Sequence, residues 1–269
     1  MKFTKILAAL LAAAMCLFAM ASCTSTPAEN NDGKLTLKIA TNAEFEPFEF
    51  LDADGNIIGF DVDLIKAISE NQNMNFEFSD MKFESVLASV SSGKCDAGLS
   101  GLTINDKRKQ AVDFTDPYYI VGQVLIVKAD DTVFTGTDAA AIVEQLKGKT
   151  VGACNGYTGK AFIEGDEDFG YTAIEGLTSV GYDSAAVGIN DLKNGKLAAF
   201  ILDDAVAEKL VAADDNQGQV KIIPIVLTEE HYAIAVEKGN TELLSKLNAG
   251  LKAIKDNGTL DQLISDWDL

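Results

Sequence analysis

The sequence has little of the material from which metal sites and catalytic sites are usually built. Its 269 residues include one histidine, His231, and four cysteines, none of them in a Cys-x-x-Cys pair. Zinc sites need clustered Cys and His ligands, and acid–base catalysis most often uses a histidine. The sequence therefore argues against a metalloprotein or an enzyme, and no cofactor is expected.

Basic side chains are also scarce. The chain has 22 Lys and Arg against 41 Asp and Glu, a formal net charge of −19. Such a chain is repelled by nucleic acids and by anionic lipid surfaces, so neither is an expected partner. Beyond residue 21, no apolar run approaches the roughly twenty residues that a membrane-spanning helix needs. The composition thus argues against a channel or a permease.

The N-terminus has the pattern of a secretory signal. Lys2 and Lys5 precede an apolar run over 6–21, and Ser22 and Cys23 follow it. A basic start, a short apolar centre and small residues before a cleavage site are typical of signal peptides. The end of the run, Met-Ala-Ser-Cys, resembles the lipobox of bacterial lipoproteins, which implies acylation of Cys23. A plain signal peptide that is cleaved elsewhere is the alternative.

We therefore expect 1–22 to be a lipoprotein signal peptide and the polar stretch 23–33 to be a flexible tether. Removal of 1–22 takes away two lysines and no acid, so the mature chain carries 20 basic and 41 acidic side chains and a formal charge of −21.

The rest of the chain alternates predicted strands and helices. Apolar patterning predicts strands at 35–40, 124–127, 150–153, 197–202 and 220–225, and helices at 61–71, 83–90, 244–254 and 260–267. Thr137 is the expected cap of a further helix, and Thr259 with Gln262 has the spacing of a capping box. The alternation indicates an α/β protein with mostly parallel strands. Cys95 and Cys154 lie in apolar surroundings and are expected to be buried and unpaired.

The stretch SGLTINDKRKQAVDFTDPYY, residues 100–119, carries the strongest functional signal. It follows a predicted strand end, and Thr103 and Asn105 are good helix starters. Arg108 lies one turn into the predicted helix. Open α/β sheets bind ligands at such strand-to-helix junctions, and arginine can hold a carboxylate through two parallel hydrogen bonds.

Four further blocks stand around this stretch in a fixed order. They are TNAEFEPFEFLDADGNIIGFDVDLIKAI (41–68), VGACNGYTG (151–159), DLKNGKLAAFILDDAVAE (191–208) and EEHYAIAVEKGN (229–240). Together with TINDKRK and VDFTDPYYIVGQ, they resemble family 3 of the bacterial extracellular solute-binding proteins, the amino-acid receptors of ABC importers.

The resemblance implies a periplasmic-binding-protein-like (type II) fold, in which two α/β lobes are joined by two crossing segments. The crossings are expected near 121–123 and 228–232. A large lobe would then comprise 34–120 plus 232–269, and a small lobe with the hinge segments would comprise 121–231.

The resemblance also implies which residues hold an amino acid. Arg108 and the backbone N–H groups of Thr103 and Thr158 are expected on the α-carboxylate, where a helix start favours anions. Asp203 is expected on the α-ammonium, with the Ser100 carbonyl and the Thr103 hydroxyl. The full expected set is Asn42, Phe45, Phe83, Ser100, Gly101, Thr103, Arg108, Asn155, Tyr157, Thr158 and Asp203.

The chain departs from the family pattern at two of these places. Tyr157 stands where the family usually has threonine, and Ala205 where it usually has proline. A phosphate-binding loop around Gly159-Lys160 is excluded, because Ala161 replaces the required Ser or Thr and Cys154 replaces the first glycine.

The sequence therefore predicts a monomeric, lipid-anchored receptor on the outer face of the cytoplasmic membrane, which closes on an α-amino acid and delivers it to an ABC permease. The residues expected to face the ligand side chain are uncharged and favour a neutral polar amino acid such as glutamine or cystine; they are Asn42, Phe45, Phe83, Asn155 and Leu202. Glu44 or Glu46 turned inward would instead favour a basic one. The alternatives are a ligand-sensing partner of a membrane receptor and a dehydratase-type enzyme on the same fold.

Overall fold

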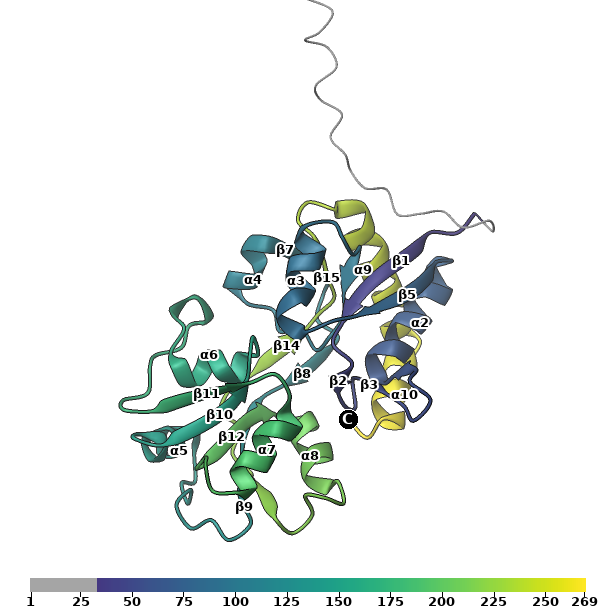
Figure 1. The fold of residues 1–269 in the computed structure, drawn as a ribbon. Helices are drawn as coiled ribbons and strands as arrows, with labels where there is room; N and C mark the ends of the chain where they lie inside the picture. The colour runs from purple at the N-terminus through teal and green to yellow at the C-terminus, as the bar shows by residue number, and fades with distance from the viewer. Residues whose placement is uncertain (1–32) are drawn as a thin grey trace, which may run out of the picture.

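The computed structural model describes residues 33–269, which form two α/β lobes joined by a short two-stranded sheet (Figure 1). The predicted signal peptide and Cys23 lie outside the described residues. Within 33–269, no helix combines the length and apolar character needed to cross a membrane.

The first lobe is built on a five-stranded sheet in the order β5-β1-β6-β15-β7. Its strands are β1 (Thr36–Thr41), β5 (Asn75–Asp80), β6 (Ala97–Gly98), β7 (Val112–Phe114) and β15 (Ala235–Glu237). Its helices are α2 (Phe60–Gln72), α3 (Phe83–Ser91), α4 (Asp106–Ala111), α9 (Thr241–Asp256) and α10 (Thr259–Asp266). A small sheet of β2 (Glu44–Phe45), β3 (Glu49–Leu51) and β4 (Ile57–Ile58) lies between β1 and α2 in the chain.

The second lobe has a sheet in the order β11-β10-β12-β9-β13. Its strands are β9 (Gln123–Lys128), β10 (Thr150–Cys154), β11 (Thr178–Tyr182), β12 (Ala199–Asp203) and β13 (Val220–Ile223). Its helices are α5 (Ala139–Leu146), α6 (Thr158–Glu164), the 3-10 turn η1 (Glu167–Phe169), α7 (Ala185–Lys193) and α8 (Asp204–Ala212).

Two strands pass between the lobes. β8 (Tyr119–Val121) and β14 (Glu230–Tyr232) pair antiparallel, with His231 opposite Ile120. In Figure 1 this pair lies between the two larger sheets. The chain therefore leaves the first lobe through β8 and returns to it through β14, which makes the first lobe discontinuous in sequence.

The expectation of mostly parallel strands is wrong in detail. In each large sheet two strand pairs are parallel and two are antiparallel. All four antiparallel pairs involve β9 or β15. Each of these strands directly follows a crossing strand, so it enters its sheet from the side of the other lobe and runs against its neighbours.

Two predicted helix caps also differ in the structure. Helix α5 begins one residue later than expected, so its cap is Asp138, whose carboxylate accepts from the Ala141 N–H at 2.8 Å. Helix α10 begins after Gly258, which takes a left-handed conformation with φ of 82°. Thr259 is thus already inside the helix, and Gln262 donates to Asp266 instead of completing a capping box.

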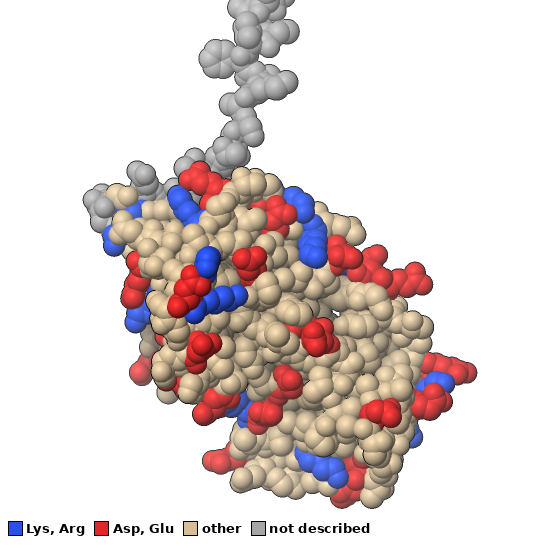
Figure 2. Space-filling view, turned by 180° about the vertical axis from the view of Figure 1, so that it is seen from behind, with Lys and Arg blue, Asp and Glu red and all other residues tan. Residues whose placement is uncertain are grey.

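The core agrees with the apolar patterns. Helix α2 packs on α9 and α10, with Ile65, Ile68 and Leu251 buried between sheet and helices. Cys95 and Cys154 are buried and unpaired, as predicted. On the face shown in Figure 2, acidic side chains are spread over both lobes and basic ones stand singly or in small groups.

Candidate functional site

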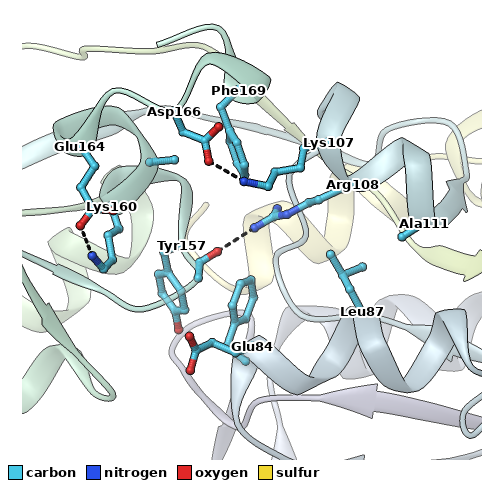
Figure 3. A pocket seen from close by; sticks show the side chains of 13 residues that line it. Glu84, Leu87, Lys107, Arg108, Ala111, Tyr157, Lys160, Glu164, Asp166 and Phe169 are labelled. Carbon is cyan, nitrogen blue, oxygen red and sulfur yellow. Dashed lines mark hydrogen bonds and ion pairs between the residues drawn. The ribbon is translucent and has the colours of Figure 1, made fainter. Parts of the chain in front are cut away.

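A small cavity of about 10 Å³ lies where the two lobes meet. Its lining comes from both lobes and consists of Phe45, Phe83, Gly101, Thr103, Arg108, Tyr157, Thr158 and Asp203. All of these residues belong to the set expected from the sequence. A wider groove opens beside the cavity and shares Phe83, Arg108 and Tyr157 with it (Figure 3).

Arg108 is held in place by its own short helix. The Asn105 side chain caps α4 by accepting from the Arg108 N–H at 2.8 Å. The guanidinium is buried and donates to the Thr103 carbonyl at 2.9 Å and, in the other lobe, to the Gly156 carbonyl at 3.1 Å (Figure 3). It also lies over the Phe83 ring, 5.6 Å from the centroid. Since arginine has five N–H donors, others remain for an anionic ligand.

Asp203 faces Arg108 from the second lobe. It ends β12, is 3% exposed, and accepts a hydrogen bond from the Tyr232 hydroxyl. Burial, with the nearby charge of Glu230, raises the pKa of Asp203 to about 7. A buried carboxylate with a raised pKa is stabilised in its charged form by a cation, so this position suits an ammonium group.

Glu230 is a site residue that the sequence analysis missed. This buried carboxylate on β14 accepts from the hydroxyls of Thr103 at 2.8 Å, Thr158 at 2.6 Å and Thr228 at 2.8 Å. Thr103 belongs to the first lobe and Thr158 to the second, so Glu230 connects both lobes to the crossing strand. The signal that points to it is its position two residues before Tyr232, which places both side chains on one face of a strand.

A pair of buried carboxyl groups supports the loop at Ser100 and Gly101. The Ser100 hydroxyl donates to Glu49 at 2.7 Å, and the Gly101 N–H and the Tyr118 hydroxyl donate to Asp61 at 3.2 and 2.9 Å. Burial and the adjacent Asp61 raise the pKa of Glu49 well above its ordinary range, and burial raises the pKa of Asp61 to about 6. Burial thus favours the protonated form of both carboxyl groups.

Gly101 fits this loop because it has no side chain. Its φ is +52°, and a Cβ atom there would lie 2.5 Å from the Phe45 ring. Any other residue would therefore push Phe45 out of the cavity wall.

Aromatic rings form one wall of the cavity. Tyr157 meets Phe45 edge-on at 5.4 Å and Phe83 at 4.5 Å between ring centroids. The departure from threonine at 157 thus adds a third ring to the two that were expected. Such edge-to-face pairs contribute about 0.5–1.5 kcal/mol beyond their buried area.

Three expected site residues do not line the cavity. The Ser100 hydroxyl is turned to Glu49 and accepts from the Asn42 N–H at 3.0 Å, and Asn42 is buried behind it. Asn155 donates to Asp183 at 3.1 Å, because a surface carboxylate next to its strand end offers a partner.

Three further side chains discussed for selectivity also lie away from the cavity. Leu202 is buried in the hydrophobic core. Glu44 and Glu46 are exposed to solvent.

Ion pairs cross the opening between the lobes. Lys107 contacts Asp166 at 2.6 Å (Figure 3), and Lys82 contacts Asp183 at 2.6 Å. Both side chains of the Lys82 pair are exposed and those of the Lys107 pair are partly exposed, so each pair contributes little to closure. Within residues 33–269, no group of His, Cys, Asp and Glu has the arrangement of a metal site.

Known proteins match this chain over most of its length. The family model described as "Bacterial extracellular solute-binding proteins, family 3" matches residues 37–268. The arginine-binding extracellular protein ArtP of Bacillus subtilis is 33% identical over 259 residues, 96% of each chain. A probable histidine-binding protein of Neisseria gonorrhoeae is 33% identical over 240 residues, 88% of this chain and 84% of that one.

Solved structures show the same two-lobed fold. An ancestral arginine-binding protein bound to glutamine superimposes with a TM-score of 0.76 at 36% identity, over 86% of this chain and 97% of that one. An ancestral arginine-binding protein bound to arginine gives a TM-score of 0.75. The predicted two-lobed α/β fold is therefore confirmed.

Proposed function

Because the chain belongs to family 3 of the bacterial extracellular solute-binding proteins, we propose that it binds one α-amino acid between its lobes and delivers it to an ABC permease. The members of this family are binding proteins and not enzymes. The observation that carries the proposal is the pair of opposite charges in one cavity. Arg108 from the first lobe and Asp203 from the second both line it. An α-amino acid presents the complementary carboxylate and ammonium.

Closure follows from this arrangement. The carboxylate is held by Arg108 with the backbone N–H groups of Thr103 and Thr158, and the ammonium by Asp203 with the Thr103 hydroxyl. A ligand that contacts both lobes stabilises the closed state over an open one by the difference in its affinity for the two. The receptor is a monomer in this proposal, since one chain supplies both halves of the site.

The N-terminal segment determines the cellular location of the protein in this proposal. Residues 1–22 act as a lipoprotein signal peptide, and acylated Cys23 anchors the chain to the outer face of the cytoplasmic membrane. The direction of β1 supports this arrangement. It starts at the end of the first lobe that is remote from the second lobe (Figure 1), so a tether there leaves the cavity accessible.

Apart from Arg108 and Asp203, the residues that line the cavity are uncharged, which favours a neutral polar amino acid such as glutamine or cystine. The rings of Phe45, Phe83 and Tyr157 can enclose a flat or thioether side chain, and Glu44 and Glu46 point to solvent. A solved ancestral relative that is named for arginine also binds glutamine.

A basic amino acid is the second candidate. Among the described residues, Arg108 is the only buried Lys or Arg, whereas Glu49, Asp61, Asp203 and Glu230 are all buried. An excess of buried negative charge favours a cationic ligand. Several relatives are also named for arginine.

Two binding experiments test the proposal. A thermal-shift screen of the twenty amino acids identifies the ligand, since ligand at a hundred times its Kd stabilises the fold by about 2.7 kcal/mol. If no amino acid raises the unfolding temperature, the receptor function is wrong. Competition calorimetry then decides whether the ligand is a neutral polar or a basic amino acid. A preference for arginine or lysine over glutamine of more than about tenfold, 1.4 kcal/mol, would select the basic class.

A further inference from the structure

Glu230 accepts hydrogen bonds from hydroxyl groups of both lobes. Its Oε2 atom accepts from the Thr103 and Thr158 hydroxyls, and its Oε1 atom accepts from Thr228. The side chain is 4% exposed and lies outside the cavity lining, behind the two threonines that belong to it. An ionised carboxylate accepts hydrogen bonds and cannot donate them.

This arrangement determines what the threonines offer to a ligand. A hydroxyl has one proton and two acceptor lone pairs. Thr103 gives its proton to Glu230, so toward the cavity it can only accept. Thr158 gives its proton to Glu230 and also accepts from the Gln123 side chain at 3.1 Å. Neither hydroxyl can then donate to a ligand carboxylate.

The same strand also controls the second acceptor of the site. Tyr232, two residues after Glu230 on β14, directs its hydroxyl to Asp203. Alternate residues of one crossing strand therefore fix both groups that face the ammonium position, Thr103 and Asp203.

We propose that Glu230 is a positioning residue that fixes the Thr103 hydroxyl as an acceptor and so makes the site select an α-ammonium over an α-hydroxyl group. The inference rests on the proposed amino-acid receptor function. An ammonium donates three hydrogen bonds and suits a site that only accepts. A hydroxyl donates one and leaves an acceptor of the buried site unpaired, which is unfavourable.

The test compares two ligands on matched variants. The first is the amino acid that most raises the unfolding temperature of the wild type. The second is its α-hydroxy acid analogue, which keeps the carboxylate and the side chain. Competition calorimetry gives the ratio of their dissociation constants for the wild type, Glu230→Gln and the control Glu229→Gln, which makes the same change at the exposed neighbour.

The Glu230→Gln amide can donate to Thr103 and so turn the hydroxyl proton toward the cavity. We expect the preference for the amino acid to fall about tenfold in Glu230→Gln and to be unchanged in Glu229→Gln. A purely structural role would weaken both ligands equally. An unchanged ratio in Glu230→Gln therefore overturns the inference.

A second variant serves if Glu230→Gln does not fold. Thr103→Val removes the acceptor hydroxyl and leaves the carboxylate in place, and it should lower the ratio in the same direction. An unchanged ratio in this variant also overturns the inference. A wild type that binds none of the twenty amino acids instead overturns the receptor function, and the inference with it.

Discussion

At the scale of single residues, the site depends on two buried charges that come from different lobes. Arg108 contacts the second lobe through the Gly156 carbonyl, and Asp203 contacts the crossing strand through Tyr232. Among residues 33–269, neither charge has an opposite charge in direct contact, which is costly in a buried site. A zwitterionic ligand would supply both missing partners.

Truncation of either residue should therefore abolish tight binding. We expect Arg108→Ala and Asp203→Ala each to weaken binding by roughly 2–5 kcal/mol, about thirty-fold to several thousand-fold, as measured by calorimetry. Lys109→Ala, at the exposed neighbour of Arg108, is the control and should bind normally. Near-normal affinity of either site variant, with a native circular-dichroism spectrum, would remove that residue from the site.

The raised pKa of Asp203 predicts how binding depends on pH. The ligand ammonium needs the ionised carboxylate, whereas the empty site favours the protonated form up to about pH 7. Affinity should therefore rise with pH, by at most about tenfold per unit, and level off above pH 7. Asp203→Asn should flatten this dependence, whereas Asp61→Asn, whose carboxyl does not line the cavity, should retain it.

The raised pKa of Asp203 also makes the stability of the ligand-free protein depend on pH, and this stability falls as pH rises. A carboxyl group with a raised folded-state pKa contributes stability below its unfolded pKa of about 4, and this stability is lost as pH rises toward 7. The unfolding temperature without ligand should thus fall over pH 4–7, while the stabilisation by ligand grows. Asp61, with a pKa of about 6, adds to the fall between pH 4 and 6.

At the scale of elements, the short helix α4 matters more than its length suggests. Its six residues carry Arg108 at the third position, and Asn105 supplies the cap. An isolated helix this short does not persist in water, so its cap and its packing keep it folded. The position of the guanidinium therefore depends on the cap.

Loss of the Asn105 cap should weaken both the fold and the site. We expect Asn105→Ala to lower the free energy of unfolding by about 0.5–2 kcal/mol and also to lower ligand affinity. Asp138→Ala removes the equivalent cap of α5, which contributes nothing to the cavity. It should cost similar stability and leave the affinity unchanged. Equal affinities of the two variants would show that α4 does not position Arg108.

At the scale of the whole molecule, the cavity takes its lining from both lobes, and the proposed lipid anchor at Cys23 is far from these residues in the sequence. Cys23→Ala should therefore prevent acylation without affecting binding. Labelled palmitate should enter the wild type and not the variant, which should be released from the membrane and bind its amino acid with wild-type affinity. Equal incorporation of label in both proteins would contradict lipidation at Cys23.

Local patterns in the sequence were sufficient to predict many of the helices and strands, and the family resemblance supplied much of the cavity lining. The spacing of apolar residues predicted α2, α3, α9 and α10, since apolar residues at the helical period lie on one face of a helix, which is then buried. The lining was reached through the resemblance of the ordered motifs to a known family, which implied Thr103, Arg108 and Asp203 as ligand contacts. Burial of the two unpaired cysteines followed from their apolar neighbours.

Only the tertiary structure decided the contacts between distant segments. Glu230 was missed because its partners Thr103 and Thr158 are 127 and 72 residues away. The hydrogen bonds of Asn155 to Asp183 and of Ser100 to Glu49 were missed for the same reason. The fold decides which polar groups lie close enough to a side chain to form a hydrogen bond with it. Strand direction was also set globally, since β9 and β15 enter their sheets from the crossing segments. A local pattern records which face of a segment is buried, but it does not record what lies against that face.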